Sequence, residues 1–273
     1  MDHPLPETNA DAVLLTQADG VATITLNHPE RHNAFDDRLI ADLTAAFIQV
    51  GADPTVRVVM LAAAGASFSA GADLGWMRRM ADYSDAENLR DAEALATLMQ
   101  TIAQCPKPVV ALVQGAAIGG GVGLVAACDI AIASEKAQFC LSEVRLGLIP
   151  AVISPYVLAA MGERACRRYF LTAERFDAAV ARTLGLIHKV VPADRLWSAG
   201  ESFAATLRQN GPAAMAAAKA LIRGVQHPAP EHSNPHAIAA WTARQIADIR
   251  ASAEGREGVQ AFLEKRAPAW QGE

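Results

Sequence analysis

The chain has 273 residues, of which 52% are apolar, and its formal net charge is −5. It is long enough to bury a substantial core, as one large domain or as one domain with an appendage. The acidic balance, without a helical face rich in Lys and Arg, argues against nucleic-acid binding. No apolar stretch reaches the ~20 residues that span a bilayer. The first ten residues lack the apolar centre of a secretory signal, so we expect a frayed tail and a cytoplasmic protein.

The first half of the sequence predicts short apolar strands that alternate with helices. The predicted strands are Ala12–Thr16, Val21–Leu26, Val56–Ala62, Val109–Val113 and Ile130–Ala133; the predicted helices are one from Asp36, one over Asp85–Gln104 and one from Gly119 to Cys128. An Asp-Gly turn between the first two strands indicates a hairpin. Helical crossovers between the later strands favour an α/β architecture with parallel pairing.

From Ala151 onward helical patterns dominate, and only Lys189–Val191 predicts a strand. The predicted helices are Ile153–Met161, Glu163–Leu171, Asp177–Leu184, Leu196–Arg208, Ala213–Val225, His236–Ser252 and Glu257–Lys265. We therefore divide the chain into a core over residues 1–195 and a helical region over residues 196–273. The apolar stripes of that region must pack against the core or against another copy of the chain.

Metal and redox chemistry receive little support from the sequence. The four cysteines are scattered in apolar surroundings without CxxC spacing, and the histidines form no HExxH motif. We expect buried thiols of a reduced compartment and no metal cofactor.

Two glycine-rich segments and one carboxylate are the candidates for a functional site. Phe68–Asp73 and Ala117–Gly123 follow apolar runs and lead into helical patterns, and Glu143 lies further along the chain. Glycine lets a backbone N–H approach a ligand closely. The N–H groups of Ala72 and Gly120 can therefore stabilise one oxygen on which negative charge develops, as when a thioester carbonyl becomes an enolate. Glu143 has apolar flanks that favour a raised pKa, which suits an acid/base near neutral pH.

Each of these features has a simpler interpretation when it is taken alone. An isolated glycine triplet is most often a tight turn, and a lone glutamate is most often a surface charge. Arg78 and Arg79 follow the first glycine segment and fit an exposed helix face, with contact to an anionic substrate tail as the alternative. The combination of two amide segments with one carboxylate is what favours a site.

In combination, these motifs resemble the enoyl-CoA hydratase/isomerase, or crotonase, superfamily over nearly the whole chain. The matching stretches are Leu26–Ala34, Phe68–Asp73, Gly115–Gly121, Ala127–Ile130, Ala137–Phe139, Ser142–Glu143, Leu146–Pro150 and Phe262–Arg266. The resemblance implies a spiral of repeated ββα units. It also implies a helical C-terminal region used for trimerisation, so that the protein forms a homotrimer or a hexamer built as a dimer of trimers.

The resemblance further implies an acyl-CoA substrate whose thioester oxygen lies between the N–H groups of Ala72 and Gly120, with Glu143 as the acid/base. Coenzyme A is then part of the substrate, and no separate cofactor is expected. The residues implied to bind the substrate or its CoA portion are Arg31, Ala34, Ala70, Asp73, Leu74, Gly119, Phe262 and Lys265.

One departure from the family pattern concerns Gly123. Typical hydratases of the family hold the attacking water between two glutamates, and Gly123 stands where the first of them would be. We hypothesise that the space left there admits a second water or the distal carboxylate of the substrate. Loss of one acid/base ordinarily costs ~10²–10⁴ in rate, so the two-glutamate mechanism does not simply transfer.

Three interpretations therefore stay open. Segments 69–77, 140–155, 252–255 and 262–270 are similar to bacterial 3-methylglutaconyl-CoA hydratases of leucine breakdown, which also resemble this chain in a glycine at the position of Gly123. This similarity favours hydration of a branched enoyl-CoA, with a dicarboxylic acyl group as one candidate. The second is a Δ3,Δ2-enoyl-CoA isomerase, which works with a single glutamate. The third is a CoA-thioester-binding protein without chemistry, against which the presence of Glu143 argues. We expect the hydratase.

Overall fold

A six-stranded sheet, of order β1-β2-β3-β4-β6-β9, runs through the body of the protein. The computed structural model describes residues 11–232 and 234–271, so the expected N-terminal tail lies outside the described residues. The strands are β1 (Val13–Ala18), β2 (Val21–Leu26), β3 (Val58–Ala63), β4 (Val109–Val113), β6 (Ile130–Ser134) and β9 (Lys189–Val191). The hairpin β1–β2 is antiparallel, and every other pairing in this sheet is parallel. Both the predicted hairpin and the predicted parallel sheet are confirmed.

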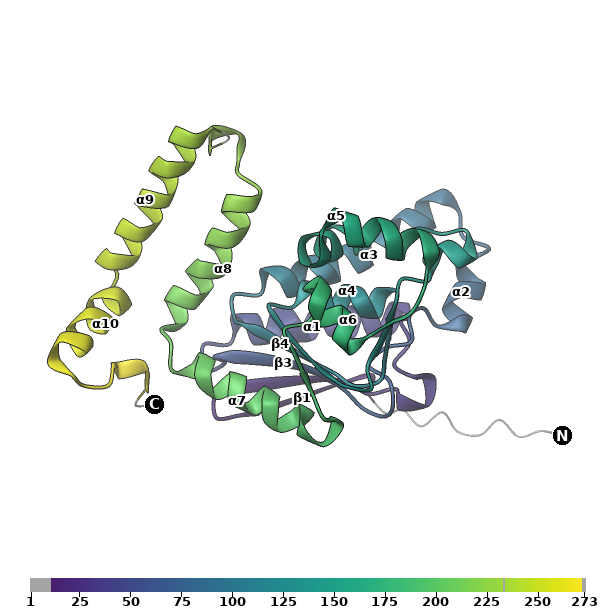
Figure 1. The fold of residues 1–273 in the computed structure, drawn as a ribbon, viewed down its shortest axis with the longest axis horizontal. Helices are drawn as coiled ribbons and strands as arrows, with labels where there is room; N and C mark the ends of the chain where they lie inside the picture. Colours follow the sequence, from purple (N-terminus) through teal and green to yellow (C-terminus); the bar gives the residue numbers. More distant parts are fainter. Residues whose placement is uncertain (1–10, 233, 272–273) are drawn as a thin grey trace.

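Helices cover both faces of this sheet, which explains why its inner strands are apolar along their whole length. Side chains alternate between the faces, so that Val59 and Leu61 of β3 point to one core cluster and Val58 and Met60 to the other. On the first face lie α1 (Asp37–Ala52), α3 (Asp85–Gln104), α4 (Gly120–Ala127), α5 (Ser154–Thr172) and α6 (Ala178–Leu184). On the other face lies α7 (Leu196–Arg208) (Figure 1).

Local signals explain where the long helices begin. The side chain of Asp36 accepts a hydrogen bond from the Leu39 N–H and caps α1; the sequence allows either Asp36 or Asp37 in this role, and the structure selects Asp36. Ser84 and Glu87 form a reciprocal capping box at the start of α3. The two helices predicted over residues 153–171 form α5, which is bent at Gly162, where φ is +77°.

A second, three-stranded sheet was missed by the sequence analysis. It consists of β5 (Ala116–Ile118), β7 (Gln138–Cys140) and β8 (Phe176–Asp177), in the order β5-β7-β8. Strands of two or three residues are too short to show a hydrophobic period, so the pattern had no means of revealing them. This small sheet matters because it carries the segments that form the candidate site.

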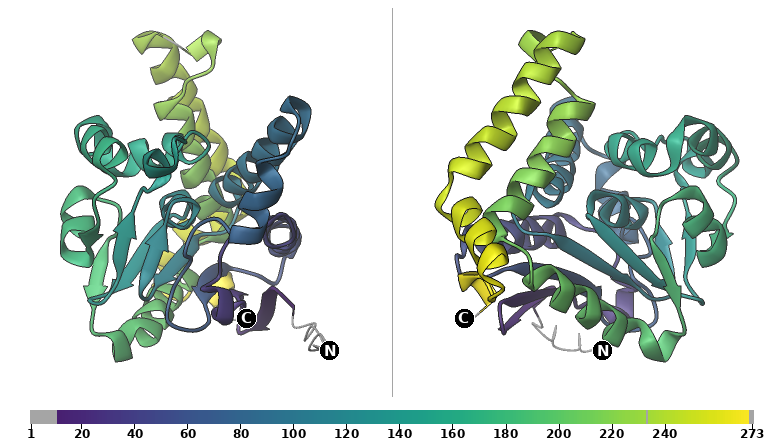
Figure 2. Two further views of the ribbon diagram at one scale, coloured as in Figure 1. Left: turned by 90° about the vertical axis from the view of Figure 1, so that its right-hand side faces the viewer. Right: turned by 60° about the vertical axis from the view of Figure 1, so that its left-hand side comes forward.

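The C-terminal helices α8 (Pro212–Gln226), α9 (Pro235–Ala251) and α10 (Ala253–Glu264) form an arm that stands away from the body (Figures 1 and 2). By packing, α7 belongs to the body, because Leu196, Ala199 and Ala204 lie in the core cluster beneath the sheet. The arm therefore begins at α8 rather than at residue 196. Among the described helices, none combines the length and the apolarity needed to cross a membrane.

The remaining elements are short. They are α2 (Leu74–Met80) and the 3-10 helices η1 (Pro29–Arg31), η2 (Glu143–Leu146), η3 (Ala193–Arg195), η4 (Pro230–His232) and η5 (Ala269–Gln271).

Candidate active site

Backbone pairing brings the two glycine-rich segments side by side. Ser69 forms a parallel bridge with Ala117, and the Ile118 N–H donates to the Ser69 carbonyl at 2.9 Å. The Gly119 N–H donates to the carbonyl of Cys140 at 2.8 Å. Because Cys140 ends β7 three residues before Glu143, these bonds bring both glycine segments to the carboxylate.

A cavity of about 480 Å³ lies where these segments meet. Six of the residues predicted for the site line it: Ala70, Ala72, Leu74, Gly119, Gly120 and Glu143. Apart from Ser142, the other lining side chains are apolar or absent. The fold thus assembles the predicted amide segments and the predicted acid/base around one space.

Two backbone donors in this cavity have no acceptor among the described residues. The bridge between Phe35 and Ala72 is closed by the Phe35 N–H on the Gly71 carbonyl at 2.6 Å and the Asp73 N–H on the Phe35 carbonyl at 2.7 Å, so the Ala72 N–H is unused. Gly120 is the first residue of α4, where N–H groups have no intrahelical acceptor and the helix dipole favours negative charge. Two unpaired N–H donors in one cavity are able to stabilise negative charge on an oxygen bound between them.

Glu143 supplies the ionisable group of the cavity. It begins η2, and within the described chain its buried Oε2 has no hydrogen-bond partner. Burial raises the pKa of this carboxyl, which suits a group that exchanges a proton near neutral pH. A Cβ at Gly119, where φ is +52°, would lie 3.1 Å from Oε1 of Glu143. Glycine at position 119 therefore allows the second amide segment to lie against the carboxylate.

Comparison with known proteins agrees with this geometry. Residues 16–273 match the family described as enoyl-CoA hydratase/isomerase. The chain belongs to this family. An enoyl-CoA hydratase structure from Shewanella pealeana superposes on it with a TM-score of 0.90 at 46% identity, covering 95% of this chain and 96% of that one. The helical arm and the mixed α/β body are thus those of the crotonase fold.

Curated relatives in the family are also similar over most of their length. The enoyl-CoA hydratase ACTT6 of Alternaria alternata is 34% identical over 265 residues, which are 96% of this chain and 85% of that protein. The (E)-benzylidenesuccinyl-CoA hydratase of Thauera aromatica is 32% identical over 263 residues, which are 95% of this chain and 99% of that protein. The chain is accordingly a member of a family of acyl-CoA enzymes.

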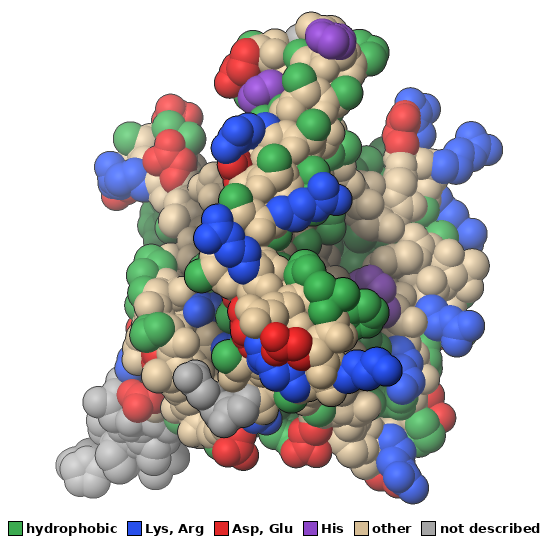
Figure 3. Space-filling model, turned by 90° about the vertical axis from the view of Figure 1, so that its left-hand side faces the viewer, with side chains coloured by type: hydrophobic (Ala, Val, Ile, Leu, Met, Phe, Trp, Pro, Cys, Tyr) green, Lys and Arg blue, Asp and Glu red, His purple; other side chains and the backbone are tan. Residues whose placement is uncertain are grey.

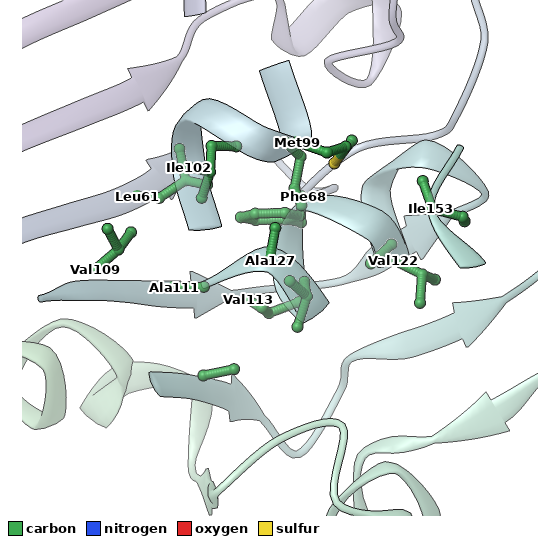
Figure 4. Close-up of a cluster of buried hydrophobic side chains, with 14 of the residues drawn as sticks. Leu61, Phe68, Met99, Ile102, Val109, Ala111, Val113, Val122, Ala127 and Ile153 are labelled. Carbon is green, nitrogen blue, oxygen red and sulfur yellow. The ribbon is translucent and has the colours of Figure 1, made fainter. Parts of the chain in front are cut away.

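The hypothesis that space is left beside Gly123 is wrong. Gly123 is buried in α4, and a Cβ built there would lie 2.2 Å from Cγ2 of Ile153 and 3.3 Å from Cε of Met99. Ile153 is 2% exposed, and Figure 4 shows it close to Val122, the residue before Gly123. The position of the missing family glutamate is thus filled by an aliphatic side chain, which leaves no room for a second water or for a substrate carboxylate.

Three other predicted residues lie next to the cavity without lining it. Arg31 and Ala34 belong to the segment that leads into Phe35, which does line it. The carboxylate of Asp73 accepts hydrogen bonds from the N–H groups of Gly75 and Trp76, at 2.8 and 3.0 Å, and so caps α2. The structure therefore gives the Asp73 side chain a local partner that the sequence analysis did not foresee.

Phe262 and Lys265 are not brought to the cavity within one chain. They lie at the end of α10, and α10 and α2 are at opposite ends of the molecule in Figure 1. Phe262 is 81% exposed. Arg78 and Arg79 also stay outside the cavity, and Arg79 pairs with Asp37 at 2.5 Å.

Sequence reasoning missed the apolar wall of the cavity. Trp76, Met77 and Met80 reach it from α2, and Leu95 reaches it from α3. The indole N–H of Trp76 donates to Asp91 at 3.1 Å and so ties α2 to α3. The sequence signal that could have revealed this wall is the apolar spacing of the α2 residues that follow the Asp73 cap. With only seven residues in α2, that signal is weak.

Within residues 11–232 and 234–271, no three His, Cys, Asp or Glu side chains come together to hold a metal ion.

Proposed function

We propose that the protein adds water across the α,β double bond of a branched enoyl-CoA, with Glu143 as the acid/base and Ala72 and Gly120 as the oxyanion donors. The observation that carries this proposal is that, among the described residues, two unpaired N–H groups and a carboxylate whose buried Oε2 has no hydrogen-bond partner meet in a single cavity. The family match and the hydratases among its relatives support it.

The proposed reaction needs only one protein carboxylate. Glu143 accepts a proton from water while the water oxygen bonds to the β carbon, and the electron pair of the double bond moves toward the thioester. The N–H groups of Ala72 and Gly120 stabilise the enolate oxygen that results; one such donor is typically worth ~10²–10³ in rate. Glu143 then returns the proton to the α carbon. The product is the 3-hydroxyacyl thioester, with one water added and Glu143 regenerated.

The substrate in this proposal brings its own coenzyme A, and no further cofactor takes part. Ala70, Leu74 and Gly119 line the cavity and would hold the thioester region. The resemblance names 3-methylglutaconyl as a branched acyl group, and the name of the Thauera relative points to another substituted acyl group. A branched acyl group is therefore the first candidate.

The parts of the proposed CoA site that lie far from the cavity require a second copy of the chain. Phe262 and Lys265 on α10 cannot reach the cavity of their own chain in this structure. We propose that they meet the CoA portion bound to a neighbouring subunit, in a homotrimer or a dimer of trimers. Arg31 and Ala34 lie beside Phe35 and would contact the CoA portion from the same chain.

A Δ3,Δ2-enoyl-CoA isomerase is the second candidate, and one observation favours it. Glu143 is the only ionisable side chain among the described residues that line the cavity, and Ile153 fills the place of a second one. A single carboxylate can remove a proton from the α carbon and return it to the γ carbon, with the same amides holding the dienolate oxygen.

A substrate panel separates these functions. We expect purified protein to convert 3-methylcrotonyl-CoA or another branched 2-enoyl-CoA to its 3-hydroxy product faster than it shifts the double bond of 3-hexenoyl-CoA. Faster conversion of the 3-enoyl thioester would support the isomerase and contradict the hydratase. Tight thioester binding without turnover of any member would indicate a protein that only binds CoA thioesters.

A further inference from the structure

Among the side chains that line the acyl cavity in the described residues, the only charge is negative. Glu143 is the only ionisable side chain among the described lining residues. Just behind the wall, Asp73 caps α2 and Asp91 accepts the indole N–H of Trp76, so both add negative charge. Burial also raises the pKa of Asp91, as expected for a carboxyl beside an apolar wall. The arginines on the neighbouring elements do not line the cavity: Arg79 pairs with Asp37 of α1, and Arg145 of η2 donates to the carbonyl of Ala173.

The wall itself is hydrocarbon from its inner end to its mouth. Trp76, Met80 and Leu95 line the interior. At the mouth, Leu74, Leu148 and Ile149 line the same cavity although they are 69%, 52% and 72% exposed. Large apolar side chains that gather around a cavity while exposed to water mark a site for an apolar ligand.

A carboxylate at the far end of the acyl group would meet two penalties here. In a glutaconyl group the distal carboxylate is only a few bonds from the carbon at which Glu143 acts, so two negative charges would share one poorly hydrated space. Against the apolar side chains of this wall the carboxylate would also lose water. With the Trp76 indole N–H bonded to Asp91, the described lining residues offer it no cation and only the hydroxyl of Ser142, beside Glu143, as a side-chain donor. An alkyl group at the same place would instead increase the binding affinity, because each methylene that is buried raises it about fourfold.

We propose that the site selects an acyl-CoA whose acyl group is uncharged and branched or extended, and discriminates against acyl groups that carry a distal carboxylate. Trp76, Met80 and Leu95 bind the hydrocarbon chain, and Leu148 and Ile149 contact its far end. This specificity rests on the proposed function, because it takes the cavity beside Glu143 as the acyl site.

Two saturated thioesters of the same shape test the proposal without turnover. Glutaryl-CoA ends in a carboxylate, and 5-methylhexanoyl-CoA carries two methyl groups in place of its two carboxylate oxygens. We expect calorimetric titration at pH 8 to show that 5-methylhexanoyl-CoA binds about tenfold or more tightly than glutaryl-CoA. Equal affinity, or tighter binding of glutaryl-CoA, would overturn the proposal.

Two variants test whether the preference for 5-methylhexanoyl-CoA over glutaryl-CoA arises from the residues of this cavity or only from the greater hydrophobicity of the ligand. Glu143→Gln removes the like charge, so glutaryl-CoA is expected to bind several-fold more tightly than to the wild type, while 5-methylhexanoyl-CoA changes little. Leu148→Lys places a cation at the mouth and is expected to reduce the preference several-fold. Leu89→Lys is the matched control, because Leu89 is 58% exposed on α3 and does not line the cavity. If Leu148→Lys and Leu89→Lys give the same ratio as the wild type, the assigned wall is wrong.

Activity assays distinguish failure of this inference from failure of the proposed function. The unsaturated pair is 3-methylglutaconyl-CoA and its neutral counterpart 3,5-dimethylhex-2-enoyl-CoA, and kcat/KM for hydration is expected to be higher for the neutral thioester. A higher value for 3-methylglutaconyl-CoA leaves the hydratase intact and contradicts the inference. If neither thioester is hydrated while 5-methylhexanoyl-CoA still binds more tightly than glutaryl-CoA, the hydratase proposal fails and the acyl preference stands.

Discussion

At the scale of single residues, the site depends on a carboxylate kept without a partner. The Oε2 atom of Glu143 is buried and accepts no hydrogen bond from the described residues, and an unsatisfied buried acceptor costs stability. Gly119 and Gly123 determine what surrounds it. The first allows the amide segment to approach Oε1, and the second is packed by Ile153, which excludes a second polar group.

The raised pKa of Glu143 predicts both an activity profile and a stability profile. Hydration needs the ionised carboxylate, so kcat/KM should fall as pH drops through the raised pKa, at a pH above the ~4.3 of an ordinary glutamate. Because the folded-state pKa is raised, the wild type should lose stability relative to Glu143→Gln as pH rises through that pKa. Activity assays and urea unfolding from pH 4 to 8 check this prediction. An acid limb at or below pH 4.3, or a stability difference independent of pH, would contradict it.

Packing at Gly123 gives a second prediction at this scale. Gly123→Ala should destabilise the fold by about 1–3 kcal/mol, because its Cβ would overlap Ile153. Ile153→Ala alone should also destabilise, by about 2–5 kcal/mol through the cavity it leaves. The double variant should lose less free energy of unfolding than the sum of the two single losses, because the smaller residue at position 153 leaves room for the Cβ at position 123. Urea unfolding of all four proteins measures this coupling, and strict additivity would show that the two residues do not compete for the space.

At the scale of elements, the sequence was most informative where patterns are long. The hairpin, the buried parallel strands, α1 and α3 follow from apolar runs, periodicity and caps such as Asp36. The glycine segments and Glu143 were recognisable only in combination, because a glycine triplet or a lone glutamate has a simpler interpretation when it is taken alone. The small sheet and α2 were not predictable, since elements of two to seven residues carry too little periodicity. The content of the space beside Gly123 depends on Ile153, thirty residues away, and no local pattern shows that contact.

The cap of α2 lies next to Ala72, the residue proposed above as an oxyanion donor. Asp73→Ala removes the acceptor for two N–H groups and should destabilise α2 by about 1 kcal/mol, which corresponds to about fivefold in kcat/KM if it acts through the site geometry. Asp73→Asn keeps the accepting Oδ1 and should remain close to wild type. Steady-state kinetics of both variants tests this assignment. If Asp73→Asn were as damaging as Asp73→Ala, capping would not explain the effect, and the result would favour the contact with the CoA portion that the family resemblance implies for Asp73.

At the scale of the whole molecule, the arm of α8, α9 and α10 exposes several large apolar side chains to solvent. Among the described residues, α8 and α9 contain no buried residue, whereas Ile222, Phe262 and Leu263 are 61%, 81% and 73% exposed. Figure 3 shows hydrophobic side chains over the arm, between Lys and Arg. Polar contacts hold the arm to the body, including Lys219 on Asp129 at 2.6 Å. Its apolar surface is best explained by packing against further copies of the chain.

This arrangement predicts assembly through the arm. The mass of the sedimenting wild type should be a multiple of the 28.8 kDa of one chain. Leu263→Asp should lower this mass toward that of a single chain. Leu171→Asp is the matched control, because Leu171 is 75% exposed on α5, outside the arm. Analytical ultracentrifugation distinguishes the outcomes. A monomeric wild type, or equal effects of the two variants, would contradict assembly through the arm.

The most direct test of the central claim is to measure kcat for hydration of a branched 2-enoyl-CoA by Glu143→Gln and by the wild type. Both proteins are first shown to be equally folded, and their affinity for 5-methylhexanoyl-CoA serves as the reference for binding. If Glu143 is the only acid/base of the site, kcat should fall by about 10²–10⁴, while the saturated thioester binds as tightly as before. Hydration that persists within tenfold of the wild type would show that another group activates the water, and would contradict the single-carboxylate site described here.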